Sequence, residues 1–577
     1  MSIRKDPCIV TLLLRPLPLI LALGLGAALP ARAWDGAAGP YLAGRLASYE
    51  SDYVAAADYY TRALAADPNN PGLMENVVIS QIGRGAIDKA LKPALLLGEL
   101  GAKSQVADLV VLSDLAAKKD FAGAIAELDK GRTGGPLVDG LFRAWALVGL
   151  GQMSEATAAF EKVSEASGSR AFGLYHKALA LASVGDFEGA DRIFSGEEGG
   201  PLRATRRGIL AHAQILSQLE RNADAVELID KTMGEAMDPV FATLRDELKA
   251  GKPLPFTVVT SPTDGLAEVF FTVATALNGE SADVNTLAYA RMAEFLAPGQ
   301  SDAVLLCASI LEAQGQHDLA TESFNRIPRE DPAYVAAELG RTDALIAAGR
   351  VDAAIEALQQ LAKAVPGRAD IWGALGDTFR RQERYAEAVN AYDKAIATFA
   401  AEEPGQWVVY YTRGIANERE KNWEKAEADF RKALELRPDQ PAVLNYLGYS
   451  YLEMNTNLDE ALGMIERAVA ARPDDGAIVD SLGWALYRLG RYGDAVAQLE
   501  KAVELMPVDP VVNDHLGDVY WAVGRKREAE FQWKRALSFE PDTEEEAARI
   551  RRKLEVGLDV VLKEEGAEPL AVTKNGD

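Results

Sequence analysis

Four histidines are the side chains of this chain with the clearest capacity for acid–base catalysis or metal binding. They are His176, His212, His317 and His515. None has a partner at the spacing of a metal-ligand motif, and each lies in a different stretch of the chain. Asp514 precedes His515, and such a pair can transfer a proton, but two polar neighbours on one helix face explain it more simply.

Motifs that build catalytic or cofactor sites are missing from the sequence as well. It contains no G-x-S-x-G, no phosphate-binding P-loop and no dinucleotide-binding glycine pattern. Cys307 lies beside Ala308 in a predicted helix, and we expect it to be a buried thiol without a reactive role. We therefore predict a protein that is not an enzyme, with no catalytic residue, no cofactor and no metal.

The elements that would position any functional side chain recur along the chain. Thirteen alanines mark the recurrence, mostly 34 residues apart: Ala56, Ala90, Ala124, Ala156, Ala190, Ala225, Ala320, Ala354, Ala388, Ala426, Ala461, Ala495 and Ala529. Many have a small residue twelve positions earlier, a glycine five positions earlier and a bulky apolar residue four positions later. A period of this length indicates a stack of helix pairs.

One such unit is too small to fold alone. Ordering 34 residues costs roughly 50 kcal/mol at about 1.5 kcal/mol per residue. Offsetting that cost requires on the order of 2000 Å² of apolar burial at about 25 cal/mol per Å². A single helical hairpin has no second layer that could bury so much, so neighbouring units must supply the rest of the core.

These units resemble the tetratricopeptide repeat (TPR) family. The clearest are residues 477–507 and 511–541, and the resemblance extends from about residue 37 to about residue 541. It implies an all-α fold, a TPR α-solenoid in which helix pairs form a right-handed superhelix. An irregular joint is expected to divide the solenoid into two arms. The family is a scaffold, so the resemblance identifies a class of architecture before it identifies a function.

The predicted organisation has seven segments. They are a signal peptide (1–33), an N-terminal TPR-like arm of six units plus a short helix (34–250), a linker or hinge (251–262), an irregular helical pair (263–299), a C-terminal TPR arm of seven units (300–541), a capping helix (542–562) and a disordered tail (563–577). The hinge is inferred from three prolines and two glycines within 251–265. Thr543 and Glu546 form a capping-box pattern at the start of the capping helix.

The N-terminus has the features of a secretory signal. Arg4 and Lys5 precede an apolar run at 17–29, and Ala31-Arg32-Ala33 is an A-x-A cleavage site. Cleavage after Ala33 would make the protein periplasmic or secreted, whereas an uncleaved leader would act as a membrane anchor. No later stretch approaches the ~20 apolar residues of a transmembrane helix, so no integral membrane segment is expected after cleavage.

The chain is strongly acidic. It carries 61 Lys and Arg against 86 Asp and Glu, a formal net charge of −25. This charge argues against nucleic-acid partners, which need a basic surface, and against anionic lipid. It favours either basic partners or simply a well-solvated surface.

The resemblance also implies a site, because the first helix of each TPR pair lines the inner groove. Transferred to the last three full units, the groove positions are Asn445, Tyr449, Asp480, Trp484, Tyr487, Asp514, Asp518 and Trp521. Aromatic rings with carboxylates would suit a basic or amide-bearing peptide. The pattern differs from carboxylate-clamp TPRs, which use Lys, Arg and Asn. Trp484 and Trp521 could instead be partly buried between adjacent first helices.

Together these features predict a non-enzymatic scaffold or adaptor of the periplasm that binds protein or peptide partners. Residues 440–541 also resemble exported TPR proteins of Gram-negative bacteria, some of which are outer-membrane lipoproteins that present substrates to a processing protease. This chain lacks their lipobox cysteine. The alternative is a structural component of an envelope assembly or a polysaccharide-export complex.

Overall fold

The computed structural model describes residues 36–166, 168–234, 238–279, 283–567 and 570. It is 75% helical, and the described residues contain no strand. The predicted all-α solenoid is therefore confirmed. The predicted signal peptide lies outside the described residues. Two compact units divide the chain, one ending at Lys363 and the other beginning at Ala364. We call them the N-terminal unit and the C-terminal unit.

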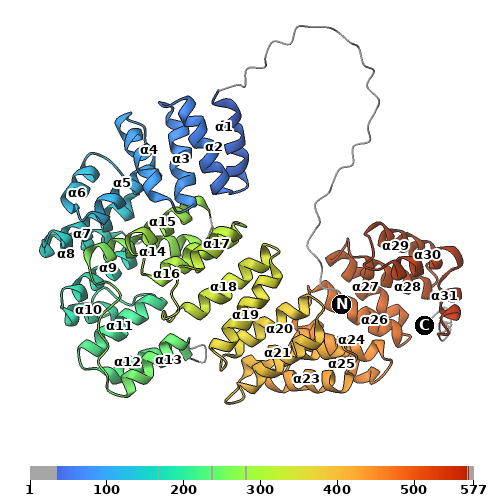
Figure 1. Ribbon diagram of the computed structural model, residues 1–577. Coiled ribbons are helices and arrows are strands. Elements are labelled where there is room, and N and C mark those ends of the chain that lie inside the picture. The colour runs from blue at the N-terminus through green and yellow to red at the C-terminus, as the bar shows by residue number, and fades with distance from the viewer. Residues whose placement is uncertain (1–35, 167, 235–237, 280–282, 568–569, 571–577) are drawn as a thin grey trace, which may run out of the picture. The chain divides into compact units, whose positions relative to one another are not determined.

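Six helix pairs open the described part of the N-terminal unit (Figure 1). They are α1 (Ala38–Tyr49) with α2 (Tyr53–Ala66), α3 (Pro71–Gly83) with α4 (Ile87–Glu99), α5 (Gln105–Ala117) with α6 (Phe121–Asp129), α7 (Pro136–Gly149) with α8 (Met153–Glu165), α9 (Arg170–Ser183) with α10 (Phe187–Phe194), and α11 (Arg206–Gln218) with α12 (Asn222–Met233). The unit continues through α13 (Pro239–Lys249), α14 (Pro262–Asn278), α15 (Val284–Leu296), α16 (Ser301–Ala313), α17 (His317–Phe324), α18 (Tyr334–Ala347) and α19 (Val351–Ala364).

Five helix pairs and two terminal helices form the described part of the C-terminal unit. The pairs are α20 (Ala369–Arg381) with α21 (Tyr385–Ala397), α22 (Trp407–Arg419) with α23 (Trp423–Leu436), α24 (Pro441–Glu453) with α25 (Leu458–Ala471), α26 (Gly476–Arg488) with α27 (Tyr492–Leu505), and α28 (Pro510–Ala522) with α29 (Lys526–Ser538). A 3₁₀ turn, η2 (Pro404–Gln406), precedes α22, and α30 (Glu544–Val556) and α31 (Leu558–Glu564) follow α29.

The repeated residues have the packing roles that their spacing predicts. All thirteen alanines of the repeat are fully buried. The small residue of the first helix lies against the bulky residue of the second, so that a Cβ added at Gly376 would lie 2.5 Å from the Tyr392 ring. Gly490 and Gly524 end their first helices with φ of 75° and 82°, a conformation that glycine adopts without strain.

The segment expected to be a hinge is packed along α11. Leu254, Val258 and Val259 are buried. Gln214 of α11 donates to the Thr257 hydroxyl and accepts from its backbone N–H, each at 2.9 Å. This differs from a free linker at 251–262, and the compact units divide at 363/364 instead. The prolines and glycines of the segment indicated a loop, but the apolar residues between them bury it.

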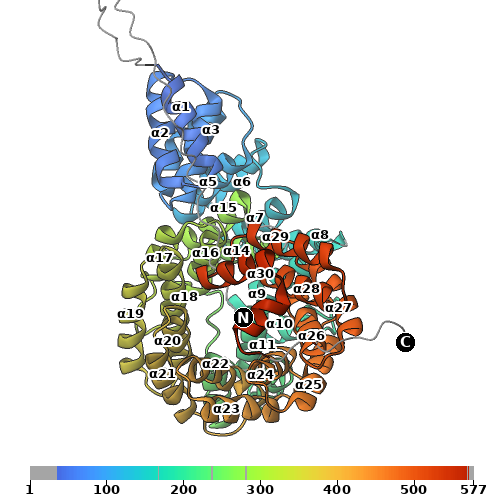
Figure 2. The ribbon, with the colours of Figure 1, turned by 90° about the vertical axis from the view of Figure 1, so that its right-hand side faces the viewer.

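This packed segment leads into a hairpin, α14–α15, that covers the first helices of the preceding repeats. α14 lies along α7 and α9, and α15 lies along α3 and α5 (Figures 1 and 2). Phe270 packs against Phe142 with ring centroids 6.2 Å apart, and Gly265 faces the buried Trp145 ring so closely that a Cβ would overlap it. The irregular helical pair expected at 263–299 thus belongs to the core of the N-terminal unit.

Buried charges attach the hairpin to the repeats. The carboxylate of Glu268, which is fully buried, accepts a hydrogen bond of 2.8 Å from the Tyr175 hydroxyl and pairs with Arg207 of α11. Arg291 of α15 donates to the carbonyl of Gly83 at 3.2 Å and pairs with Glu294 at 2.8 Å. The first-helix surface of α3 to α9 is consequently occupied by the protein's own chain.

Candidate partner-binding surface

The eight predicted groove residues lie on α24, α26 and α28, and half of them are core. Asn445, Asp480, Tyr487 and Asp518 are buried, whereas Tyr449, Trp484, Asp514 and Trp521 are partly exposed. The sequence identified the helices correctly, but it did not distinguish side chains that face outward from those that face the neighbouring repeat.

The carboxylates of α28 already hold a basic side chain from the same protein. The ammonium group of Lys553 in α30, itself buried, lies 2.8–2.9 Å from both oxygens of Asp514 and 2.6–2.8 Å from both oxygens of Asp518. The guanidinium of Arg549 lies 3.7 Å from Asp518. A basic partner chain was expected at this position, and α30 fills the place that such a chain would take.

Trp521 belongs to the contact between α28 and the terminal helices. Its indole N–H donates to the carboxylate of Asp559 at 2.9 Å. A Cβ added at Gly557 would lie 2.5 Å from the same ring, and Trp533 packs on it with centroids 5.4 Å apart. Gly557, with φ of 85°, also separates α30 from α31, so the predicted capping helix 542–562 is two helices. The predicted capping box at Thr543 is present.

Trp484 stands at the centre of a column of three rings. It stacks on His515 with centroids 4.0 Å apart and on Tyr487 at 4.8 Å, and its indole N–H donates to Glu453 at 3.1 Å. His515 pairs with Asp480 at 3.0 Å, not with its chain neighbour Asp514. The predicted possibility of acid–base chemistry between residues 514 and 515 therefore has no geometric basis here.

Three carboxylates set the charge of His515. Burial alone would lower the pKa of this imidazole, but Asp480, Asp514 and Asp518 together raise it above its ordinary value. A protonated imidazole stacked on Trp484 adds a favourable cation–π contact. When protonated, His515 is a counterion to the acidic inner positions of α26 and α28.

Tyr449 on α24 is partly exposed. Burial raises the pKa of its phenol, and the negative charges of Glu453 and Asp480 raise it further. Glu546 of α30 also contributes to this increase, so the field of the terminal helix reaches α24. The neighbouring Asn445 is buried, and its side-chain oxygen has no hydrogen-bond partner.

The side chains that still face outward are mainly aromatic and cationic. We define the aromatic surface as Tyr411, Tyr449 and Trp484 together with Arg419, Glu453 and Arg488; all three rings are partly exposed. Tyr411 and Arg419 lie outside the last three full units, to which the predicted groove was limited. Their register on α22 matches that of Asp480 and Arg488 on α26, and this signal was available in the sequence.

The histidines outside this surface and Cys307 have structural roles. His176 is buried, with Nδ1 accepting from Trp145 at 3.1 Å and Nε2 lying 3.1 Å from Thr272, and burial lowers its pKa to about 3. His212 pairs with Asp191 at 2.8 Å. Burial also raises the pKa of the Cys307 thiol well above its ordinary value, which keeps the thiol protonated and unreactive.

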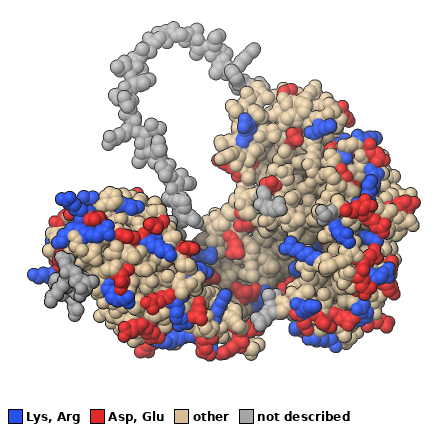
Figure 3. Space-filling view, turned by 180° about the vertical axis from the view of Figure 1, so that it is seen from behind, with Lys and Arg blue, Asp and Glu red and all other residues tan. Residues whose placement is uncertain are grey.

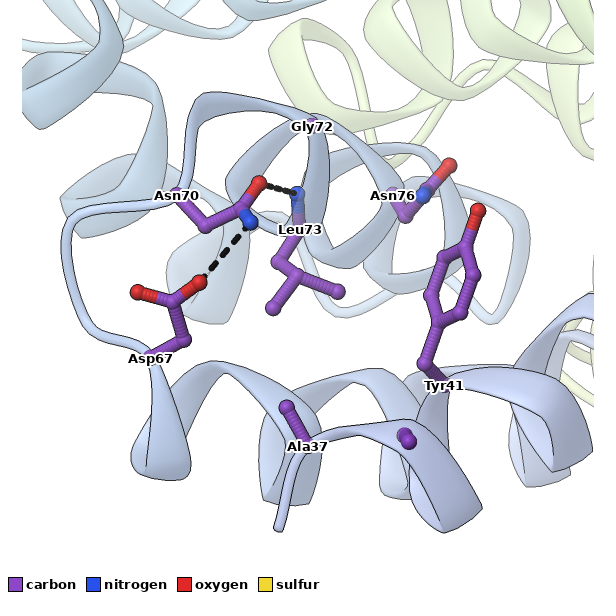
Figure 4. A pocket seen from close by; sticks show the side chains of 8 residues that line it. Ala37, Tyr41, Asp67, Asn70, Gly72, Leu73 and Asn76 are labelled. Carbon is purple, nitrogen blue, oxygen red and sulfur yellow. Dashed lines mark hydrogen bonds between the residues drawn. The ribbon is translucent and has the colours of Figure 1, made fainter.

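One pocket is resolved at the N-terminal end of the described chain. It has a volume of about 270 Å³ and lies between the start of α1 and the start of α3. Tyr41 and Asn76 stand at one side, Asp67 and Asn70 at the other, and Leu73 lies between them (Figure 4). Asn70 uses its amide internally, because it donates to Asp67 and accepts from the N–H of Leu73.

Within the described ranges, no group of three or more His, Cys, Asp or Glu is placed to hold a metal ion. Across those same ranges, none of the helices has the length and apolar character needed to span a membrane. Acidic and basic side chains are interspersed over the face shown in Figure 3. Surface ion pairs such as Arg350–Asp318 and Lys432–Glu402 join some of the opposite charges of the molecule. This supports a well-solvated surface over a single extended charged patch.

Comparison with known proteins identifies the repeat. Residues 339–405, 375–441, 411–475 and 447–510 match the family model of the tetratricopeptide repeat. Residues 339–510 carry tetratricopeptide repeats. A TPR repeat-containing protein of Pseudomonas aeruginosa, PA4667, is 32% identical over 163 residues, which are 28% of this chain and 27% of that protein. The predicted resemblance to the TPR family is thereby confirmed.

Several solved TPR chains share the helical architecture at low identity. A chain of the APC/C Cut9–Hcn1 hetero-tetramer is 17% identical, with 90% of this chain and 96% of that chain covered and a TM-score of 0.38. A TPR protein from Parabacteroides merdae is 18% identical, with coverages of 45% and 98% and a TM-score of 0.35. YrrB, described as having an unusual peptide-binding site, is 19% identical, with coverages of 34% and 99% and a TM-score of 0.28.

Proposed function

We propose that this protein is a non-enzymatic TPR scaffold that binds a protein or peptide partner on the aromatic surface of its C-terminal unit. The repeat family is a protein-interaction scaffold. The observation that supports this choice of surface is the contrast in coverage of the first helices. Those of α3 to α9 are covered by α14–α15, whereas Tyr411, Tyr449 and Trp484 on α22 to α26 remain partly exposed.

The charges at this surface favour a different partner from the basic chain that the sequence suggested. Asp480, Asp514 and Asp518 are neutralised by His515, Lys553 and Arg549 within the protein. The cations of the aromatic surface are Arg419 and Arg488; Arg419 lies 3.6 Å from Glu418 and Arg488 lies 3.8 Å from Glu453. The preferred partner therefore carries an apolar or aromatic side chain for the Trp484 region and a carboxylate for an arginine.

The location and the pathway are part of the same proposal. The A-x-A motif that ends at Ala33 supports export of the protein. N-terminal sequencing of the protein from fractionated cells would test both the cleavage and the location. In that setting the scaffold would present bound proteins to an envelope protease. Co-purification of a protease would support this role, and co-purification of export or assembly subunits would support the structural alternative.

The partner-binding experiment is a comparison of two tryptophan variants. Trp484→Ala removes a ring of the aromatic surface, whereas Trp423→Ala removes a partly buried ring from the second helix α23. Immobilised protein would capture partners from an envelope extract, and the affinity of an identified partner would then be measured. Trp484→Ala should weaken binding by at least about 30-fold, because a central tryptophan contributes strongly to an interface. Equal binding by Trp484→Ala and the unsubstituted protein would refute the assignment.

A further inference from the structure

The first helix of the described solenoid exposes an apolar stripe. Leu42 is 64% exposed, Leu46 61% and Tyr49 89%. These residues are four and three positions apart, so they lie on one side of α1. We call them the α1 stripe. Exposed single leucines are common on protein surfaces, but three large apolar side chains in one row on a terminal helix form a contiguous patch.

The same register positions meet the preceding repeat elsewhere in the chain. Leu42 lies two residues before the small residue of its helix, Gly44. The equivalent residue of α28 is His515, which pairs with Asp480 and stacks on Trp484 of the preceding first helix, α26. The equivalent residue of α24 is Tyr446, whose ring lies 6.0 Å from that of Tyr411 on α22.

Leu46 occupies the second of these stacking positions, two residues after Gly44. Its equivalents inside the solenoid, Ala146 of α7, Ala485 of α26 and Val519 of α28, are all fully buried. Leu42 and Leu46 therefore have the geometry of a stacking contact but have no preceding repeat within the described residues. The two leucines are apolar, like residues that are buried between repeats.

The opposite end of the described chain does not offer a matching surface. α30 begins with Glu544, Glu545 and Glu546, and in α31 Leu558 and Val561 are buried whereas Val560 is 40% exposed. A head-to-tail stack of α1 onto α30–α31 would bring leucines against carboxylates. A second α1 stripe supplies apolar side chains at the same spacing.

The charge of α1 also suits contact between two copies. The chain has a formal net charge of −25, so most of its surface repels a second copy. The helix Ala38–Tyr49 contains no Asp or Glu and a single cation, Arg45. Two such helices can approach without placing like negative charges at the contact.

We propose that the α1 stripe is a self-association surface, through which two copies of this chain pair about a two-fold axis. In an antiparallel arrangement, Leu42 of one copy faces Leu46 of the other, and the reverse contact follows by symmetry. Three side chains from each copy form an interface smaller than the standard size of stable complexes. The dimer is therefore weak, with a dissociation constant on the order of 10 μM.

Sedimentation velocity tests this inference, using the protein purified from its host cell in the form that results from natural processing. Between about 1 and 100 μM the sedimentation coefficient should rise from that of a monomer to that of a dimer. The double variant Leu42→Glu/Leu46→Glu should stay monomeric throughout this range. Phe531→Glu is the matched control, because Phe531 is also 61% exposed but lies on α29.

Two further measurements separate the alternatives. Raising the salt concentration from 50 to 500 mM should strengthen the dimer, because salt screens the repulsion between two acidic chains. Vesicles of neutral phosphatidylcholine test a lipid surface as the occupant. A monomer at all concentrations, an equal effect of Phe531→Glu, or vesicle binding that depends on Leu42 and Leu46 would each overturn the proposal. Circular dichroism would verify that both variants keep the helical content of the parent protein.

Discussion

Individual charges in the C-terminal unit are neutralised by residues from neighbouring elements. Asp480 and Asp518 are buried, and each has a cationic partner more than 30 residues away in the chain: His515 for the first and Lys553 for the second. A buried carboxylate is costly without such a partner, whereas the pair itself adds specificity more than net stability. These contacts therefore determine which side chains remain available to a partner protein.

Lys553→Met is expected to destabilise the C-terminal unit by about 3–5 kcal/mol, because it removes the hydrogen-bonded cation of Asp514 and Asp518 and leaves only Arg549, 3.7–3.9 Å away. Urea unfolding followed by circular dichroism measures the change. Lys563→Met, at an exposed position of α31, is the matched control and should change stability by less than about 0.5 kcal/mol. Similar midpoints for the two variants would show that the buried ammonium group has no such role.

His515 makes stability depend on pH in a defined direction. Its pKa in the folded protein is raised above its ordinary value of about 6.5. The stabilisation from its charge is therefore fully present below about pH 6.5 and is lost as the pH rises through the folded pKa. The destabilisation caused by His515→Gln should be larger at pH 5.5 than at pH 9.5, as measured by urea unfolding at each pH. Asp480→Asn should move this dependence to lower pH, and a pH-independent difference would contradict the assignment.

Helices in both units approach each other through contacts between a small and a bulky residue. Within a repeat the contact is local, as between Gly376 and Tyr392, and the 34-residue register predicts it. Between α14 and α7 the same kind of contact forms without a repeat, because Gly265 meets Trp145. Sequence periodicity anticipated the first contact but contained no signal for the second.

Gly265→Ala tests the packing of α14 on α7. Its Cβ would overlap the Trp145 ring, which is fully buried and cannot move into solvent, so a loss of about 1–3 kcal/mol is expected. Gly279→Ala is the matched control, since its Cβ would meet no atom closer than 3.7 Å. Thermal and urea unfolding of the two variants should differ clearly. A neutral Gly265→Ala would mean that the hairpin does not lie against α7.

At the scale of the whole chain, burial and not composition determines which connections are accessible. Residues 251–262 have the prolines and glycines of a linker, yet Leu254, Val258 and Val259 are buried and the segment is hydrogen-bonded to α11. Residues 400–405 are exposed, and 400–403 are irregular. Residues 251–262 are therefore not expected to be the first site of proteolytic cleavage.

Brief digestion with proteinase K should cleave 400–405 before 254–259. Mass spectrometry of the early fragments identifies the sites. Gly265→Ala should then increase cleavage at 254–259 without affecting 400–405, because it loosens the hairpin that follows the segment. Early cleavage within 254–259 in the unsubstituted protein would instead restore the interpretation of a flexible hinge.

The sequence alone was sufficient for the repeat architecture, the core alanines and the helices that carry the candidate surface. These features depend on contacts within one unit, where a period of 34 residues places a small residue opposite a bulky one. Only the tertiary structure decided which parts of that surface are open. Residues such as Trp145 and Gly265, or Asp514 and Lys553, are brought together by folding over long sequence separations, and no local pattern encodes their contact. For this reason the covered first helices of the N-terminal unit and the internal neutralisation of the acidic positions could not be predicted.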